Sequence, residues 1–374
     1  MIIKNGHVLS ADFTHFEDRD LMIENGLICD HFPEDAAIVD AKGAYIIPGF
    51  IDTHIHGYQG ISFVDGETDF APARLALALQ GTTGCAPTLR CLQRERFYHE
   101  IKGVVRQVGS PGKGAKVLGI HSEGPFISKD KGGAMKAPDI ECTVEEVGHM
   151  IEAGEGMLKI ITIAPERENA AAVIAAHHDK TAFSLGHTLA TYDESMAAAD
   201  AGASRSTHTF NAMRSLYHRE TGVLGAVLTD DRFTCEMIAD FVHLDPPLCK
   251  MIYKLKGADK ITLVSDTGEM GGLPDGEYIV DGRTRIVKDG VCKNMEGRIA
   301  GSCFTLLRGV QNLRKIGIPL PEIARMASFN PAKAMGMEDQ MGSIAPGKCA
   351  DLIFCDEMAN ILAVYVDGVK VEEA

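Results

Sequence analysis

Short apolar runs that end in polar residues recur through the middle of the chain, with helical patterns between several of them. The helical patterns include segment 73–80, rich in helix formers, and the Ala-rich segment that follows the capping box Thr191-x-x-Glu194 and stops at Gly202. Strand–helix alternation predicts a parallel sheet, and eight repeats favour a closed (β/α)8 TIM barrel of the α/β class. The eight predicted strands cover residues 46–52, 82–86, 117–121, 160–164, 182–187, 204–209, 234–239 and 261–266.

The two ends of the chain follow another pattern, in which short β-type runs are joined by turn residues. Asn5-Gly6 and Asn25-Gly26 each lie between two apolar runs, which is the strongest short-range signal of a β-hairpin. We expect residues 1–45 and 340–374 to form one small β-sandwich domain, and residues 46–339 to form the barrel. Residues 275–301 interrupt the barrel pattern with Gly, Asp and β-branched residues, which indicates a β-hairpin insertion after the eighth strand.

Composition and charge narrow the class of protein. The chain has 374 residues, 45% of them hydrophobic, which is enough for a large core. Its net charge of −15 argues against nucleic acid as a partner, although one Arg can still neutralise the phosphate of a small ester. The ten cysteines include no CxxC pair, the N-terminus has no signal-peptide pattern, and no run approaches the ~20 apolar residues needed to cross a bilayer. We expect a reduced, cytoplasmic protein without membrane contacts.

Imidazole and carboxylate side chains follow several of the predicted strands. His54 and His56 are two residues apart on an extended segment, so their rings point the same way. In a barrel the carboxyl ends of the strands meet at one face, where reactive groups gather. Each residue alone reads more readily as a hydrogen-bonded core or loop residue, but together they predict a site for a transition metal such as Zn or Fe. The other strand-end residues are Glu123, His187, His208 and Asp266.

Longer motifs resemble those of a known family. Residues 48–57 (PGFIDTHIHG) look like the opening motif of the amidohydrolase superfamily. Residues 121–126 (HSEGPF), 186–188 (GHT) and 207–213 (THTFNAM) resemble N-acetylglucosamine-6-phosphate deacetylases in particular, in the expected order and spacing. The fourth predicted strand ends in Ile163-Ala164-Pro165, without the Lys that dihydroorotases and hydantoinases use there, which argues against those enzymes.

The resemblance implies roles for the strand-end residues. Glu123, His187 and His208 would bind the principal metal, and His54 and His56 a second one bridged by Glu123. One or two divalent ions per subunit are therefore expected, Zn ahead of Fe. Asp266 would accept a proton from metal-activated water and return it to the leaving nitrogen. The implied reaction is hydrolysis of N-acetylglucosamine 6-phosphate to glucosamine 6-phosphate and acetate.

The same resemblance implies substrate contacts and a homodimer. Its substrate-binding positions are Ala134, Asn211, Ala212, Arg219 and His243. In this family the Arg can arrive from the neighbouring subunit, which implies a dimer.

One departure leaves the substrate open. Met135 stands where the family usually has a His that polarises the carbonyl, and a thioether cannot donate a hydrogen bond. Either Lys136 or a metal takes that role, or the substrate differs. The alternatives are a related N-acyl compound such as N-acetylgalactosamine 6-phosphate, or a catalytically inactive scaffold.

Overall fold

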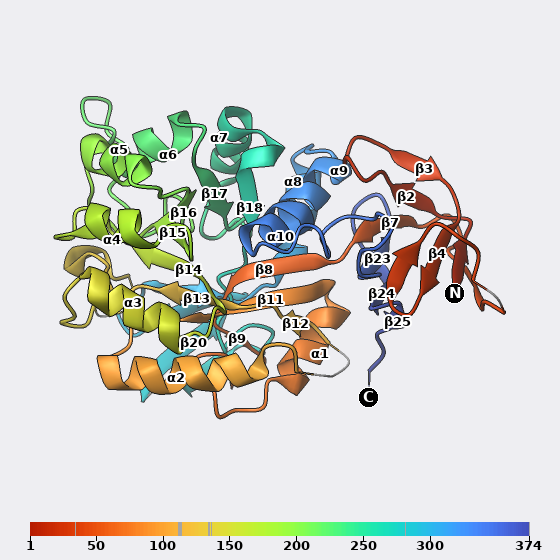
Figure 1. Ribbon diagram of the computed structural model, residues 1–374, viewed down its shortest axis with the longest axis horizontal. Helices are drawn as coiled ribbons and strands as arrows, with labels where there is room; N and C mark the ends of the chain where they lie inside the picture. The colour runs from red at the N-terminus through yellow and green to blue at the C-terminus, as the bar shows by residue number, and fades with distance from the viewer. Residues whose placement is uncertain (34, 111–113, 134, 136, 281, 374) are drawn as a thin grey trace.

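A barrel of eight parallel strands forms the main body of the computed structural model, which describes residues 1–33, 35–110, 114–133, 135, 137–280 and 282–373 (Figure 1). Strand pairing runs from β8 through β11 and β13 to β18, and β12 (Lys116–Val117) flanks β11. A parallel bridge between Ile55 and Thr267 joins the last strand segment to the first. The barrel strands are β8 (Phe50–Ile55), β11 (Thr82–Leu89), β13 (Ile120–Glu123), β14 (Leu158–Ile163), β15 (Ala182–Leu185), β16 (Arg205–Ser206), β17 (Thr234–Met237) and β18 (Ile261–Leu263).

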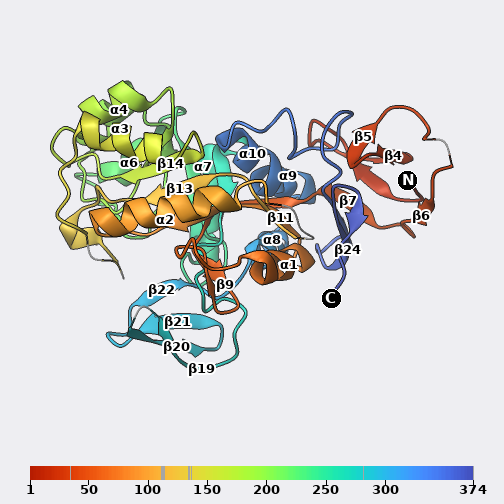
Figure 2. The same ribbon diagram turned by 60° about the horizontal axis from the view of Figure 1, so that its bottom comes forward.

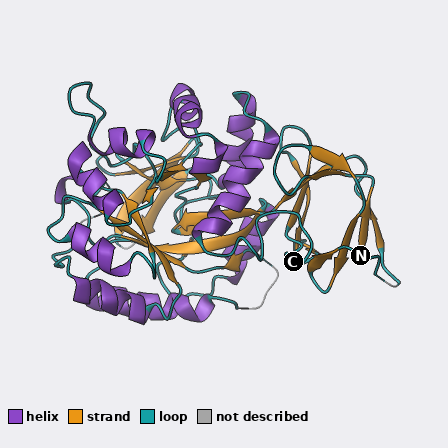
Figure 3. Cartoon of the chain, turned by 45° about the horizontal axis from the view of Figure 1, so that its top comes forward, coloured by secondary structure: helices purple, strands orange, loops and turns teal. Residues whose placement is uncertain are grey.

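Helices cover the outside of the barrel (Figure 3). The predicted capping box is present, because the Thr191 hydroxyl accepts from the backbone N–H of Glu194 and the Glu194 side chain accepts from that of Thr191. Gly202, with φ of 116°, follows the end of this helix as expected. The helices are α1 (Ala71–Leu79), α2 (Arg94–Gln107), α3 (Val144–Ala153), α4 (Ala170–His177), α5 (Tyr192–Asp200), α6 (Gly222–Thr229), α7 (Pro246–Lys256), α8 (Leu306–Lys315), α9 (Leu320–Ala324) and α10 (Asn330–Ala334), with a π-helical turn at Arg325–Phe329.

The two ends of the chain form a small β-sandwich beside the barrel, as the sequence predicts (Figures 1 and 3). A four-stranded sheet has the order β5-β4-β1-β6, and a six-stranded sheet has the order β25-β24-β23-β7-β2-β3. The second sheet therefore joins N-terminal and C-terminal strands. The strands are β1 (Ile2–Lys4), β2 (His7–Leu9), β3 (Phe16–Asp18), β4 (Leu21–Glu24), β5 (Leu27–Cys29), β6 (Ile38–Asp40), β7 (Tyr45–Pro48), β23 (Leu352–Cys355), β24 (Ile361–Val366) and β25 (Val369–Lys370).

Two local predictions at the N-terminal end are wrong. Asn25-Gly26 does close the β4–β5 hairpin, but Asn5-Gly6 does not close one, since β1 and β2 belong to different sheets. The physical reason is that Asn5 alone has a positive φ, whereas the two-residue turn needs both residues positive, as at Asn25 and Gly26. The first predicted strand, 46–52, is also two strands separated at Gly49, where a Cβ would lie 2.1 Å from the Thr83 side chain.

The insertion after the eighth strand is larger than the predicted hairpin. It is a four-stranded antiparallel sheet of β19 (Gly276–Val280), β20 (Arg283–Lys288), β21 (Val291–Asn294) and β22 (Ile299–Ser302). Figure 2 shows it projecting from one end of the barrel beside β9 (Gly57–Tyr58), which pairs with β10 (Ile61–Ser62).

All ten cysteines are free thiols. No helix in the described part of the chain is long and apolar enough to span a membrane.

Candidate active site

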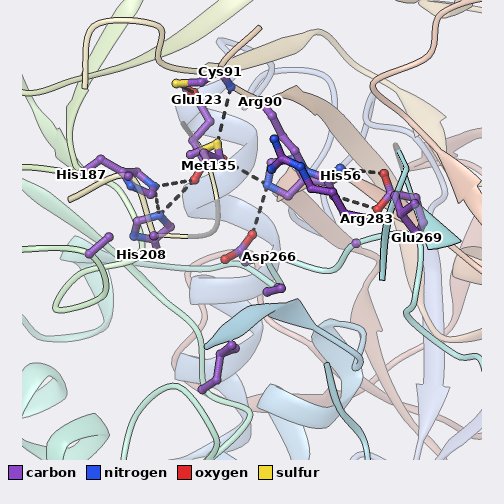
Figure 4. A pocket seen from close by; sticks show the side chains of 18 of the residues that line it. His56, Arg90, Cys91, Glu123, Met135, His187, His208, Asp266, Glu269 and Arg283 are labelled. Atoms are coloured by element: carbon purple, nitrogen blue, oxygen red, sulfur yellow. Dashed lines mark hydrogen bonds and ion pairs between the residues drawn. The ribbon is translucent and has the colours of Figure 1, made fainter. Parts of the chain in front are cut away.

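The carboxylate of Glu123, at the end of β13, is the centre of a buried cluster of imidazoles (Figure 4). Its Oε1 atom lies 2.9 Å from Nε2 of His187 and 3.1 Å from Nε2 of His208. Nε2 of His54 is 3.4 Å from the same oxygen, while Nε2 of His56 is 3.3 Å from Oε2. The structure thus brings together the five residues that the sequence assigns to metal binding, with the rings of His187, His208 and His54 at Oε1 and the ring of His56 at Oε2.

Strained backbone at the strand ends aims these side chains into the barrel mouth. His187, His208 and Asp266 each follow a barrel strand, and they have φ values of 49°, 29° and 50°. Positive φ is uncommon for residues other than glycine and costs free energy, so it persists where surrounding structure holds it. Three such residues at one face indicate that the fold preserves this arrangement of side chains at a cost in local stability.

Hydrogen bonds on the outer ring nitrogens orient the imidazoles. Nδ1 of His187 lies 2.7 Å from the carbonyl oxygen of Lys131, and Nδ1 of His56 lies 2.9 Å from that of Thr88. A carbonyl oxygen only accepts, so each Nδ1 donates to it and a neutral ring then presents the lone pair of Nε2 to the cluster. This is the tautomer that a metal ligand needs.

The cluster fits a divalent transition metal. Nε2 of His54 is buried and forms no hydrogen bond within the described residues. Nε2 atoms of His187 and His208 lie 3.0 Å apart, so two ring nitrogens face each other beside one carboxylate. A cation among these atoms would satisfy the lone pairs together, and imidazole with carboxylate is the donor set that Zn and Fe accept.

Electrostatics keep the two carboxylates ionised. Burial raises the pKa of Glu123, but its close contacts with the imidazoles of His187 and His208 outweigh it and hold that pKa well below its usual range. Burial likewise opposes ionisation of Asp266, whereas His56 and His54 lower its pKa. Oδ1 of Asp266 lies 3.2 Å from Nε2 of His56. Its side chain is 15% exposed, more than any ring in the cluster, so Asp266 faces the open side and can accept a proton.

Sequence reasoning missed a carboxylate beneath the cluster. Glu236 lies within β17, fully buried, and its Oε2 accepts from the backbone N–H of His208 at 3.1 Å. The same oxygen lies 3.1 Å from Nδ1 of His54, and Arg205 approaches the other oxygen at 3.5 Å. The signal that could have revealed it is a Glu inside an otherwise apolar strand, where an ionised side chain is costly unless paired.

A cavity of about 480 Å³ opens above the cluster. Asn211, Ala212 and His243, the substrate contacts proposed from the sequence, line it, and Met135 lines it as well. Nδ1 of His243 lies 2.8 Å from Oδ2 of Asp240, and this carboxylate raises the imidazole pKa even though burial lowers it.

Other predicted contacts lie elsewhere. Arg219 is exposed and does not line this cavity, and its Nη1 donates to the Tyr217 hydroxyl at 2.6 Å. Ala134 and Lys136 lie outside the described residues.

Arginines occupy the side of the cavity away from His187 and His208 (Figure 4). Arg90 follows β11 and donates to both oxygens of Glu269, at 2.8 Å each. Arg283 and Arg285, on β20 of the insertion, line the cavity too. These four charged residues come from three separate segments, which explains why no local sequence pattern predicted them.

Comparisons with known proteins agree with this geometry. Residues 45–371 match the amidohydrolase family. The chain is 33% identical over 365 residues to N-acetylglucosamine-6-phosphate deacetylase of Lysinibacillus sphaericus, covering 96% of this chain and 94% of the relative. It is 31% identical over 361 residues to N-acetylgalactosamine-6-phosphate deacetylase of Escherichia coli, covering 94% of each.

Solved structures are similar over the whole chain. The crystal structure of N-acetyl-D-glucosamine-6-phosphate deacetylase from Mycobacterium smegmatis has a TM-score of 0.90 at 33% identity and full coverage of both chains. An aspartate-to-alanine variant of that protein, in complex with N-acetyl-D-glucosamine-6-phosphate, has a TM-score of 0.90 at 32% identity, covering 100% of this chain and 99% of the other.

Proposed function

This chain belongs to the amidohydrolase family, and from that premise we propose that it hydrolyses N-acetylglucosamine 6-phosphate to glucosamine 6-phosphate and acetate. The observation that carries the proposal is the convergence of Glu123, His187 and His208 with Asp266 facing the same cavity. A scaffold protein would need neither this ligand set nor an ionised carboxylate beside it. The similar deacetylases from several organisms support the same reaction class and substrate.

We assign the metal to the cluster around Glu123. His187, His208 and Glu123 would hold the principal ion, and His54 with His56 would hold a second ion that shares Glu123. Zn is our first choice and Fe our second, with one or two ions per subunit. When bound, such an ion lowers the pKa of a coordinated water to about 7 and polarises a carbonyl oxygen.

The chain's own groups then move one proton. Asp266 accepts a proton from the attacking water as the oxygen bonds to the acetyl carbon. The same proton passes from Asp266 to the nitrogen as the carbon–nitrogen bond breaks, which releases acetate and the amine. The lowered pKa of Asp266 favours its ionised carboxylate at the start of each turnover. His243, kept basic by Asp240, would hold the sugar phosphate together with the backbone N–H of Ala212 and the side-chain amide of Asn211.

We propose a homodimer in which Arg219 reaches the phosphate in the partner's cavity. Within its own chain Arg219 is exposed and absent from the cavity wall. Leu216 and Tyr217 beside it are 47% and 51% exposed, which suits an interface better than a solvated loop. The free, mostly buried thiols fit a cytoplasmic protein.

An acetate-release assay tests the function. The purified holoenzyme should release acetate from N-acetylglucosamine 6-phosphate faster than from the unphosphorylated sugar, and a chelator should abolish the activity until Zn or Fe is restored. N-acetylgalactosamine 6-phosphate belongs in the panel because of the related Escherichia coli enzyme. The proposal fails if no N-acetyl sugar phosphate releases acetate from enzyme whose metal content has been verified.

A further inference from the structure

The cavity has two polar ends, with the hydrolytic cluster between them. One end adjoins His208, because the backbone N–H of Asn211 donates to the carbonyl of His208 at 2.9 Å. Figure 4 places Arg283 and Glu269 on the other side of Glu123 and Asp266 from His208. The proposed 6-phosphate contacts belong to the first end and leave the second without an assigned ligand.

Two arginines at the second end lack a counter-charge. Arg283 and Arg285 are two apart on β20, so their side chains leave the same face of the strand, and both line the cavity. Within the described residues neither guanidinium forms a hydrogen bond or an ion pair. The nearby carboxylate of Glu269 is already occupied, since both of its oxygens accept from Arg90 at 2.8 Å.

Their charges repel one another. Burial lowers the pKa of Arg285, and the positive charges of Arg90 and Arg283 lower it further, while Cys292 and Glu269 compensate only in part. At this end the guanidinium groups of Arg90, Arg283 and Arg285 lie near one carboxylate, Glu269, whereas Glu123 and Asp266 belong to the hydrolytic cluster, so this end has spare positive charge. Guanidinium groups recognise carboxylate and phosphate with paired hydrogen bonds, so the missing ligand is an acidic group of that shape.

The wall that carries these arginines belongs to the insertion. Val280, Ile299 and Ala300 of the same sheet also line the cavity, so the insertion supplies both apolar contact and charge. A volume of about 480 Å³ leaves room for a sugar phosphate that carries a further substituent.

We propose that Arg283 and Arg285 form a second anion subsite. It selects acylamino sugar 6-phosphates that carry an additional acidic group on a carbon next to the one bearing the acylamino nitrogen. This inference rests on the proposed function, since it assumes that the acetyl group lies at Glu123 and the 6-phosphate at the Asn211 end. The extra group, a carboxylate or a second phosphate, then extends toward the insertion. Arg90 is hydrogen-bonded to Glu269, so it contributes positive charge to the subsite without binding the ligand directly.

The test compares three acetylated substrates. They are N-acetylglucosamine 6-phosphate, the same compound with a lactyl ether carboxylate on its 3-oxygen, and the same compound with a phosphate on its anomeric oxygen. The wild-type holoenzyme should hydrolyse at least one doubly anionic substrate with a kcat/KM about 10-fold or more above the simple monophosphate. Which of the two is preferred distinguishes a carboxylate from a phosphate as the natural group.

Variants assign the preference to the arginines. Arg283→Ala/Arg285→Ala should bring the ratio of kcat/KM values close to one, whereas Arg298→Ala should keep the wild-type ratio. Arg298 is a matched control because it lies in the same insertion, pairs with Glu296 at 3.4 Å and does not line the cavity. Arg283→Lys/Arg285→Lys keeps the charge but loses the planar two-point contact, so it should retain part of the preference even if the alanine pair is unstable.

Binding separates this inference from the proposed function. Calorimetric titration of the holoenzyme with the deacetylated forms of the three compounds needs no turnover. If no substrate releases acetate, the proposed function is overturned, while tighter binding of a doubly anionic form through Arg283 and Arg285 still supports the subsite. The subsite is overturned if neither doubly anionic form binds more tightly, or if Arg298→Ala removes the preference as fully as the double variant does.

Discussion

Nδ1 of His54 lies 3.1 Å from Oε2 of Glu236, and both side chains are completely buried. Hydrogen bonds to ionised groups inside a protein are strong, and this one holds the ring so that Nε2 points at Glu123. His54 is therefore oriented from β17, which is separated from its own strand β8 by β18 alone. Glu236 acts on the predicted metal site through His54 and is a positioning residue.

Glu236→Gln should weaken metal binding by about 10- to 100-fold, because the amide supports the His54 ring less well than a carboxylate does. Competition with a chelator of known affinity measures the change. Asp351→Asn is the control: Asp351 is also a buried carboxylate, paired with Lys116 at 2.9 Å, but it lies outside the cluster. Equal metal affinity in wild type and Glu236→Gln would show that Glu236 serves stability alone.

Asp266→Asn should lower kcat by about 100- to 10,000-fold while leaving metal content and KM close to wild type, because only the proton acceptor is lost. Elemental analysis of the variant checks the metal, and acetate release checks the rate. A variant that lost both metal and activity would instead place Asp266 among the ligands.

Arg219→Ala should raise KM strongly for a phosphorylated substrate and leave it unchanged for an unphosphorylated one. Mixing Arg219→Ala subunits with Asp266→Asn subunits under exchange should restore activity to about a quarter of the sites, since a mixed dimer contains one complete site. Each variant exchanged with itself is the control. No recovery in verified mixed dimers would show that Arg219 serves its own chain.

Arg90→Ala should destabilise the fold in a pH-dependent way. Although burial raises the pKa of Glu269, Arg90 brings it to about 2, below the usual 4.5. In wild type the pair therefore stabilises fully above pH 4.5 and loses this contribution as pH falls toward 2. Without Arg90 the buried, ionised Glu269 carboxylate has no partner, which lowers the free energy of unfolding by about 3 kcal/mol. This loss grows as pH rises above the pKa that Glu269 has in the variant.

Thermal unfolding of Arg90→Ala and wild type across pH 4.5–7 measures this gap, which should widen with pH. The double variant Arg90→Ala/Glu269→Gln removes the unpaired charge and should recover much of the loss. A gap that is constant with pH would show that Arg90 contributes through packing alone.

The barrel and the positions of its strand-end residues could be predicted from sequence because both depend on local order. Apolar runs indicate strands, and a residue soon after a run lies at the carboxyl-terminal face of the barrel. This holds independently of contacts with distant segments. His187 and Asp266 are examples, since they lie two residues after β15 and three residues after β18. Glu236 escaped notice because its role depends on which residue contacts it inside the barrel, and His54 is 182 positions away.

The arginines that line the cavity were also not predicted, because they come together only through contacts between distant segments. Arg90 and Glu269 are 179 positions apart, and Arg285 joins them only because the insertion folds back over the barrel mouth.

The wrong hairpin prediction at Asn5-Gly6 has a different origin. A turn dipeptide indicates which backbone conformations are accessible, but the close packing of Gly6 against Ile46 determines which one is adopted. A contact between distant residues therefore overrides the local signal here.

The six-stranded sheet also has a consequence for how the protein is made. β23 lies between β24 and β7, so β7 pairs on one side with a strand more than 300 residues later in the chain. A ribosome finishes every barrel strand before it begins Leu352–Cys355. The nascent chain therefore carries β7 with an open edge through most of its synthesis, and the small domain can close only after translation is nearly complete.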